Sequence, residues 1–308
     1  MRIADTRKDF LDGKITKSEF IQAMYQNHHS KLFDYANILK QTNIASIEIA
    51  DEEVTMKSRD KGVKMICPLG DYRSAPVEIL NFLDYETADS AMIMSLVPPD
   101  GCVLDIGANM GWYSVNIAMT YPSSRVHAFE PIAKTYSFLE RNIKLNQVRN
   151  VAAHNFGLSN ERKDLDFYFY PEGSGNASCA NLSGRPDAQV ITCHVERLDD
   201  FVHANKLHVD FIKCDVEGAE LFVFQGALET LRNDKPIVFT EMLRKWAAKF
   251  NYHPNEIITF FASLGYRCFH CDGTALKEVA EITDETVMTN FFFLHVDQEG
   301  MWHKKKRR

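Results

Sequence analysis

Residues 102–114 read C-V-L-D-I-G-A-N-M-G-W-Y-S, and this stretch decides the fold of the chain. It begins with a short apolar run of strand-forming residues, continues through Gly107 and Gly111, and leads into an amphipathic stretch that ends near residue 121. This order predicts a strand, a tight turn and a helix. In α/β proteins a ligand binds at the carboxyl end of such a strand, where the turn brings the backbone close to it. We therefore expect a ligand site at this turn.

The spacing of the turn residues favours one kind of ligand. A dinucleotide site is expected to read G-x-G-x-x-G, because its glycines admit a pyrophosphate to the helix N-terminus. The turn here reads D-x-G-x-x-x-G, from Asp105 through Gly107 to Gly111. S-adenosylmethionine has no pyrophosphate, and its sulfonium and ammonium groups suit a carboxylate beside a glycine that permits close approach. The turn predicts S-adenosylmethionine as the cofactor. The alternatives are an NAD-dependent oxidoreductase and a protein that binds the methyl donor without catalysis.

Glu130 is a second candidate for donor binding. Residues 125–130, R-V-H-A-F-E, predict a second strand that ends at Glu130, and Pro131 opens the next helix. An acid at the end of a second strand typically accepts hydrogen bonds from ribose hydroxyls. We expect Asp105 and Glu130 to lie on either side of a nucleoside. The alternative is that both are exposed acids at strand ends without a role in binding.

Two further acids, Asp215 and Glu241, are predicted at the acceptor side. The run V-D-F-I-K-C-D-V-E-G-A-E, residues 209–220, predicts a fourth strand followed by a turn that carries Asp215, and the fifth strand ends at Glu241. Neighbouring strand ends share one crevice in this topology, where carboxylates orient an acceptor hydroxyl and take its proton. We predict Asp215 and Glu241 as the catalytic residues. Glu217 and Glu220 are explained by the free amides and the dipole of the helix that follows.

Three alternatives stay open for this corner. In the first, Asp215 only caps the following helix. In the second, His194 or His270 is the base, because histidine suits proton transfer near neutral pH. In the third, the same acids hold a magnesium ion, since hard cations prefer oxygen ligands. The sequence shows no dedicated set of metal ligands, so no metal is predicted.

The chain before residue 85 has a different pattern. Three helices are expected there, over residues 5–11, 16–25 and 31–41. Alternating apolar and polar residues on both sides of a turn at 58–62 predict a β-hairpin. We therefore expect three regions in the chain: a helical and hairpin N-terminal region, 1–85; a methyltransferase domain, 86–300, with an antiparallel insertion at 157–195 that has a Gly/Ser tip; and a basic tail, 301–308.

The composition narrows the class of protein. The chain has 308 residues, of which 45% are hydrophobic and 25% charged, so it has ordinary globular composition and can build a large core. Its net charge of −7 argues against a nucleic-acid partner. No apolar run approaches the roughly 20 residues of a membrane helix, and the N-terminus lacks a signal-peptide core. We expect a cytoplasmic protein without a membrane span, and its seven scattered cysteines predict free thiols.

The runs L-D-I-G-A-N-M-G-W-Y-S, A-F-E-P, D-F-I-K-C-D-V-E-G-A-E and P-I-V-F-T-E together resemble the FkbM family of S-adenosylmethionine-dependent methyltransferases. The resemblance covers roughly residues 85–296, and D-V-E-G-A-E is its most specific part. It implies a Rossmann-like class I methyltransferase fold: a seven-stranded, mostly parallel α/β sheet whose last strand is antiparallel.

The same resemblance implies a site and a reaction. It implies donor contacts from six residues: Glu86, Asp105, Gly107, Asn109, Gly111 and Glu130. Glu86 belongs to an upstream Y-E pair and is expected near the methionine end of the donor. The resemblance implies transfer to oxygen, on a hydroxyl of a sugar, a glycoconjugate or a polyketide-like natural product. Residues 1–60 lie outside the resemblance; we expect them to cap the acceptor side or to form a homodimer contact.

Overall fold

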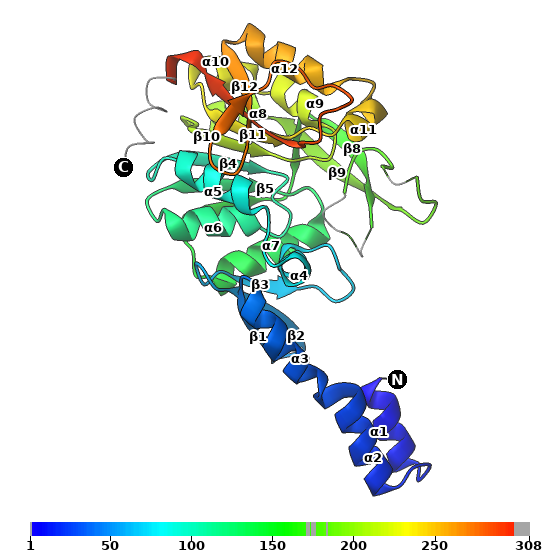
Figure 1. Ribbon diagram of the computed structural model, residues 1–308. Coiled ribbons are helices and arrows are strands. Elements are labelled where there is room, and N and C mark those ends of the chain that lie inside the picture. The colour runs from blue at the N-terminus through cyan, green and yellow to red at the C-terminus, as the bar shows by residue number, and fades with distance from the viewer. Residues whose placement is uncertain (1, 171–172, 174–176, 183, 299–308) are drawn as a thin grey trace.

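The computed structural model describes residues 2–170, 173, 177–182 and 184–298 (Figure 1). The basic tail expected over 301–308 and the centre of the Gly/Ser tip, 174–176, lie outside the described residues. Within the described part of the chain, every helix is too short or too polar to cross a bilayer.

A central sheet of eight strands organises the larger part of the molecule (Figure 1). Its strands, in sheet order, are β13 (Leu276–Glu278), β12 (Tyr266–Cys271), β14 (Asn290–His295), β11 (Ile237–Glu241), β10 (Phe211–Cys214), β4 (Cys102–Ile106), β5 (Arg125–Phe129) and β6 (Val151–His154). The five strands from β11 to β6 are parallel, and β14 is antiparallel to both of its neighbours. The Rossmann-like fold with an antiparallel last strand is therefore confirmed.

The central sheet has eight strands, one more than the seven that the resemblance implies. The short strand β13 pairs antiparallel with β12 at the edge of the sheet. Asp272 and Gly273 form the connecting turn, and Asp272 accepts hydrogen bonds from the amides of Thr274 and Ala275. An Asp-Gly pair is a hairpin signal, but only three residues follow it in β13 and two of them are exposed, so no apolar alternation marks the strand.

Helices cover both faces of the sheet, because its strands present apolar residues to both sides. On β14, Phe292 packs on one side while Phe291 and Phe293 pack on the other. One face carries α5 (Thr87–Leu96), α6 (Trp112–Thr120) and α7 (Ala133–Leu145). The other carries α8 (Leu198–Ala204), α9 (Glu220–Gln225), α10 (Leu228–Asn233) and α12 (Pro254–Ser263). A short helix, α11 (Arg244–Ala247), follows β11.

The insertion forms a separate three-stranded sheet from β7 (Gly157–Ser159), β8 (Lys163–Phe169) and β9 (Gln189–Arg197). Strands β8 and β9 are antiparallel, but β7 pairs parallel with β9. The insertion is therefore not antiparallel throughout. The chain reverses between β7 and β8 and again between β8 and β9, so β7 and β9 run in the same direction.

The N-terminal region contains the expected hairpin as part of a three-stranded sheet. Its strands are β1 (Ile44–Ala50), β2 (Glu53–Ser58) and β3 (Lys64–Cys67), and the turn expected at 58–62 connects β2 and β3. The additional turn lies at Asp51 and Glu52, which both have positive φ. The turn before β2 was not predicted because it contains no glycine or proline.

Helix α7 fastens the N-terminal sheet to the rest of the molecule. The amides of Lys64 and Ile66 on β3 donate to the side-chain oxygens of Asn146 and Asn142, at 2.8 and 2.9 Å. These bonds pair the backbone amides on the outer edge of β3, which would otherwise lack hydrogen-bond partners. Helix α4 (Ala75–Phe82) follows β3 and lies near the carboxyl ends of the central strands (Figure 1).

The first three helices extend away from the sheet as an arm (Figure 1). They are α1 (Ile3–Leu11), α2 (Lys17–Met24) and α3 (Lys31–Ile38), and a π-helical turn, Tyr25–His29, joins the last two. Thr16 and Glu19 form a capping box at the start of α2. Neither α2 nor α3 has a buried residue.

Candidate functional site

The carboxyl ends of β4, β5, β10 and β11 open into a cavity of about 510 Å³. This volume falls in the range of roughly 300–1,000 Å³ that is usual for small-molecule sites. Six of the eight predicted site residues line it: Glu86, Gly107, Asn109, Glu130, Asp215 and Glu241. Asp105 and Gly111 do not line it, so the structure does not place these two residues in direct contact with this space.

Two glycines shape the loop between β4 and α6. Gly107 has φ +73°, and a Cβ atom there would lie 1.9 Å from the carbonyl oxygen of Asp215. Gly111 has φ +87°, and its Cβ would lie 2.5 Å from Leu139 of α7. Both positions require glycine because of contacts within the protein. Gly107 in particular lets the loop lie directly against the end of β10.

Glu130 fixes the other side of this loop. Its carboxylate accepts hydrogen bonds from the amides of Asn109, at 3.1 Å, and Ile132, at 2.9 Å. Burial raises the pKa of Glu130 to about 7, although these two bonds oppose the shift. Glu130 is thus a buried carboxyl at the end of the second strand that both orders the loop and lines the cavity.

Lys213, on β10, connects the loop to the acceptor side. Its ammonium donates to the carbonyl oxygen of Gly107 at 2.9 Å, and it lies 3.5 Å from Asp105 and 3.4 Å from Asp215. Burial lowers the pKa of Lys213, but the charges of Asp215 and Asp105 outweigh it, so its pKa lies above the ordinary value. Asp105 also accepts a hydrogen bond from Ser114 at 2.6 Å and is fully buried. Asp105 therefore balances Lys213 beneath the cavity.

Sequence reasoning missed Lys213, although it left a signal. A lysine within the apolar strand F-I-K-C is unusual, because lysine is almost never fully buried without a partner.

Glu86 approaches the cavity from the start of α5. The residue as a whole is exposed, but its carboxylate accepts a hydrogen bond from the hydroxyl of Tyr113, which is buried in α6. Glu86 itself has φ +44°. This bond turns the carboxylate inward, so Glu86 reaches the same cavity as Glu130 and Asp215.

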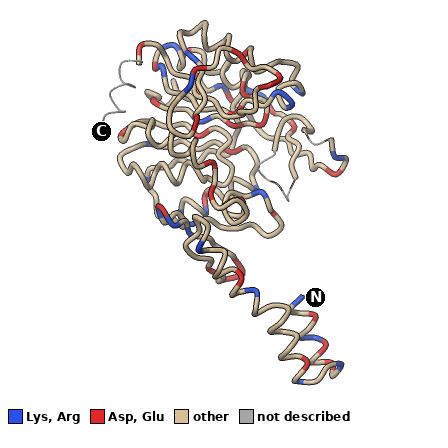
Figure 2. The backbone as a smooth tube through the Cα atoms, viewed as in Figure 1, with Lys and Arg blue, Asp and Glu red and all other residues tan. Residues whose placement is uncertain are grey.

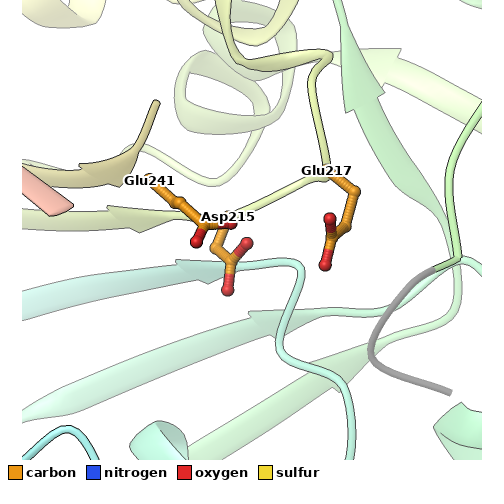
Figure 3. Close-up of side chains that lie close together, drawn as sticks. All are labelled: Asp215, Glu217 and Glu241. Atoms are coloured by element: carbon orange, nitrogen blue, oxygen red, sulfur yellow. The ribbon is translucent and has the colours of Figure 1, made fainter. Parts of the chain in front are cut away.

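Asp215, Glu217 and Glu241 form what we call the carboxylate cluster (Figure 3). One oxygen of each lies within 4.8 Å of the others. Figure 3 shows Asp215 and Glu241 at the ends of neighbouring strands and Glu217 on the turn beyond β10. Burial and then the charge of Asp215 raise the pKa values of Glu217 and Glu241 well above the ordinary range. The predicted neighbours Asp215 and Glu241 are thus brought together, with a third acid beside them.

Glu217 and Glu220 have different roles, contrary to the shared explanation that the sequence suggested. Glu220 accepts hydrogen bonds from the amides of Val216 and Gly218, at 3.1 and 3.0 Å, and so satisfies the start of α9. Glu217 does not, and its Oε2 atom is enclosed without a hydrogen-bond partner among the described residues. The N-cap residue of α9 is Ala219, and no side chain caps the helix, so the alternative in which Asp215 caps it is wrong.

The two alternative bases lie elsewhere. His194, on β9, lies 2.8 Å from Asp164 of the neighbouring strand. His270, on β12, contacts the carbonyl oxygen of Cys271. Neither lines the cavity that contains Asp215.

Comparisons with known proteins show which family and which relatives this chain is similar to. A family model described as methyltransferase FkbM domain matches residues 105–268, a little over half of the chain. "Methyltransferase 1" of Beauveria bassiana is 33% identical over 147 residues, which are 42% of this chain and 59% of that protein. "2-O-methyltransferase NoeI" of Sinorhizobium fredii is 27% identical over 165 residues, 49% of this chain and 66% of that protein. Each alignment therefore spans less than two thirds of the relative.

One of the similar solved structures is a methyltransferase FkbM from Methylobacillus flagellatus. It is 14% identical, with a TM-score of 0.41, and the match covers 64% of this chain and 44% of that one.

Proposed function

The chain belongs to the methyltransferase FkbM family, and from this we propose that it is an S-adenosylmethionine-dependent O-methyltransferase. We propose a hydroxyl of a sugar, a glycoconjugate or a polyketide-like natural product as the acceptor. The observation that carries the proposal is the shared cavity, which places the loop after β4, Glu130 of β5 and the carboxylates after β10 and β11 around one space.

The donor half of the cavity fits S-adenosylmethionine. Glu130 offers buried carboxylate oxygens to ribose hydroxyls, and Gly107 keeps the loop backbone close to the strand ends. Asn109 and Glu86 line the same space. The donor, when bound, supplies an electrophilic methyl group on a positively charged sulfur. We expect the acidic walls to favour that positive charge.

The acceptor half supports proton removal from a hydroxyl. Asp215 and Glu241 lie at neighbouring strand ends, where both hold the hydroxyl and a carboxylate oxygen of Asp215 accepts its proton. Lys213 holds Asp215 through an ion pair and keeps it in place for this role. Positioning supplies much of the acceleration in such a reaction. The name of the Sinorhizobium fredii relative, a 2-O-methyltransferase, supports oxygen as the accepting atom.

Titration calorimetry with purified protein tests the donor first. We expect binding of S-adenosylmethionine and S-adenosylhomocysteine and none of NAD. Binding of NAD without a response to the methyl donor would favour the oxidoreductase alternative and overturn the proposal.

Turnover separates an enzyme from a protein that only binds the donor. Radiolabelled methyl donor incubated with a panel of glycosides and polyketide-like alcohols should label an oxygen. Label only on amines, or donor binding without label on any member of a broad panel, would contradict O-methyl transfer to these classes.

The charge distribution fits a small-molecule or glycan acceptor better than a nucleic acid. Figure 2 shows lysines and arginines interspersed with acids along the chain, without a continuous basic stripe in this view. The cytoplasmic location expected from the sequence stays a prediction.

A further inference from the structure

We propose that the carboxylate cluster, Asp215, Glu217 and Glu241, binds one hard divalent cation such as Mg²⁺, Mn²⁺ or Ca²⁺ at the acceptor side of the cavity. The inference deepens the proposed function. The role given to the ion depends on the proposed function, whereas the metal site itself does not.

The geometry of the cluster suits a single ion. Its three oxygens lie within 4.8 Å of one another. Ligands of one Mg²⁺ lie about 3.0–4.2 Å apart and those of one Ca²⁺ up to about 5 Å apart, from metal–oxygen distances of about 2.1 and 2.4 Å. The bound of 4.8 Å on the three oxygens falls within the range for Ca²⁺ and extends a little beyond that for Mg²⁺.

Glu217 supplies a second and independent observation. Its Oε2 atom is enclosed by protein and has no hydrogen-bond partner among the described residues. A buried polar atom left unpaired costs about 1–3 kcal/mol, and more when the group is charged. The neighbouring Glu220 accepts two amide bonds, so the turn leaves Glu217 free of any capping role. An ion among the three carboxylates would supply the missing partner.

The charges around the cluster favour a cation. Lys213 is the basic group within ion-pair distance, and it reaches Asp215 but is also held by Asp105 and by the carbonyl oxygen of Gly107. Glu217 and Glu241 form no ion pair with any residue in the described part of the chain. One shared ammonium does not balance three carboxylates, whereas a dication added to it nearly does.

Three protein ligands leave coordination positions for water and for an acceptor oxygen. The cluster lines the same cavity as Gly107 and Glu130 of the donor half. A hydroxyl bound to the ion would therefore be held between the donor and Asp215. Coordination also lowers the pKa of a bound hydroxyl, which helps its proton to leave.

Glu78 provides a matched control. It lines the same cavity, but its carboxylate pairs with Arg73 at 2.8 Å and lies outside the cluster. Glu78→Gln thus removes an acid from the cavity wall without touching the proposed ligands.

Electron paramagnetic resonance with Mn²⁺, after removal of bound metal by a chelator, tests the site without any acceptor or turnover. We expect one Mn²⁺ per chain, displaced by Mg²⁺ or Ca²⁺. Glu217→Gln and Glu241→Gln should each weaken Mn²⁺ binding at least tenfold, while Glu78→Gln binds as the parent does. The absence of stoichiometric Mn²⁺ binding in the parent, or equal binding by the parent and both cluster variants, would overturn the proposal.

Two parallel measurements keep the outcomes distinct. Melting temperatures show whether a variant is folded. If a variant does not fold, the number of Mn²⁺ ions bound per chain of the parent protein decides whether the metal site exists. Calorimetry with S-adenosylmethionine reports on the proposed function separately. Metal binding without donor binding would contradict the proposed function alone, and the reverse result would contradict the metal site alone. Loss of donor rather than Mn²⁺ binding in the cluster variants would show that these acids hold the donor instead.

Discussion

Asp215 has a predicted catalytic role and contacts that are compatible with that role. It lines the cavity, belongs to the carboxylate cluster and pairs with Lys213, and it does not cap α9. We predict that Asp215→Asn lowers turnover at least roughly a hundredfold, the scale of general-base removal. Donor affinity and melting temperature should change little, because asparagine keeps an oxygen for Lys213 and Asp105 still balances the ammonium.

The measurement is turnover at saturating donor, with and without chelator. A variant as active as the parent under both conditions would exclude Asp215 both as the base and as a metal ligand needed for catalysis.

Glu130 makes donor binding depend on pH. Its pKa in the free protein is about 7, raised mainly by burial. The ionised carboxylate accepts hydrogen bonds from ribose hydroxyls more strongly than the protonated form, so donor affinity should rise with pH through 7 and level off above it. About a tenth of Glu130 is ionised at pH 6, which predicts affinity about tenfold weaker than at pH 8.

Calorimetry at pH 6, 7 and 8 checks this profile. In Glu130→Gln the profile should become flat over this range, which separates Glu130 from the other carboxyls of the cavity. A parent profile that falls with rising pH would show that the sign is wrong.

The site was predictable wherever a residue stands at a strand end, because the topology brings those ends together. Asp215, Glu241 and Glu130 were expected at strand ends in this way, and all three line the cavity. Asp105 was expected to bracket the nucleoside, yet it is buried beneath the loop, since its position within β4 points it at Lys213. Glu217 was missed because a carboxylate at a helix start has an adequate local explanation, and only the hydrogen bonds of the turn show that Glu220 fills that role.

At the scale of elements, the loop between β4 and α6 depends on contact with the end of β10. Gly107→Ala places a methyl group against the carbonyl oxygen of Asp215, at a positive φ. We predict a loss of about 2–5 kcal/mol in the free energy of unfolding, from backbone strain of about 1–2 kcal/mol and overpacking of about 1–3 kcal/mol. Donor affinity should fall as well, because the loop must move.

Gly273→Ala is the matched control for this prediction. Gly273 has φ +95°, but a Cβ atom there meets nothing within 4 Å. It should cost only the strain of about 1–2 kcal/mol and leave donor affinity unchanged. Equal losses in urea unfolding of the two variants would show that the contact with β10 does not matter.

Lys213 holds two elements together, β4 with its loop and the end of β10. Lys213→Met leaves Asp105 buried without its cation, and removing one partner of a buried pair costs about 3–5 kcal/mol. We expect that loss in urea unfolding. Adding Asp105→Asn to the variant should recover a large part of it, because the uncompensated charge is then gone.

Lys245→Met serves as the comparison. Lys245 also lines the cavity, but it is exposed and lies over the ring of Trp246, so its loss should cost less than about 1 kcal/mol. Similar stabilities for the two lysine variants would contradict the role given to Lys213.

Elements were predictable where apolar periodicity and turn residues agreed. The strands that carry the site have both signals, and they were found. Strand β13 is too short and exposed for periodicity to mark it. The turn at Asp51 and Glu52 was missed because it contains no glycine or proline, although the apolar positions shift phase across it.

At the scale of the whole molecule, the N-terminal arm does not cover the cavity. The described residues that line the cavity begin at Arg73, so the expectation that residues 1–60 cap the acceptor side is not supported. The segment 73–86, which includes α4, forms part of the cavity wall instead. The sequence could not distinguish these possibilities, because the direction of the arm depends on how β3 docks on α7.

Several apolar side chains of the arm are exposed to solvent in the single chain. Five of them lie on or between α2 and α3: Ile21, Tyr25, Leu32, Phe33 and Tyr35, each at least half exposed. Such patches mark contact surfaces. Both signs of charge occur along the arm (Figure 2), so it does not carry a single sign of charge that would oppose pairing. We propose that the arms of two copies pair and make a homodimer.

Deleting residues 1–38 tests this pairing. A cut at residue 60 would also remove β1 and β2, whose Ile44 and Met56 are buried against α4, whereas a cut after α3 leaves that core intact. We predict that the parent sediments as a dimer and the shortened chain as a monomer. Donor affinity should be equal in the two, because none of the removed residues lines the cavity. A monomeric parent or a dimeric shortened chain in analytical ultracentrifugation would show that the arm does not form the interface.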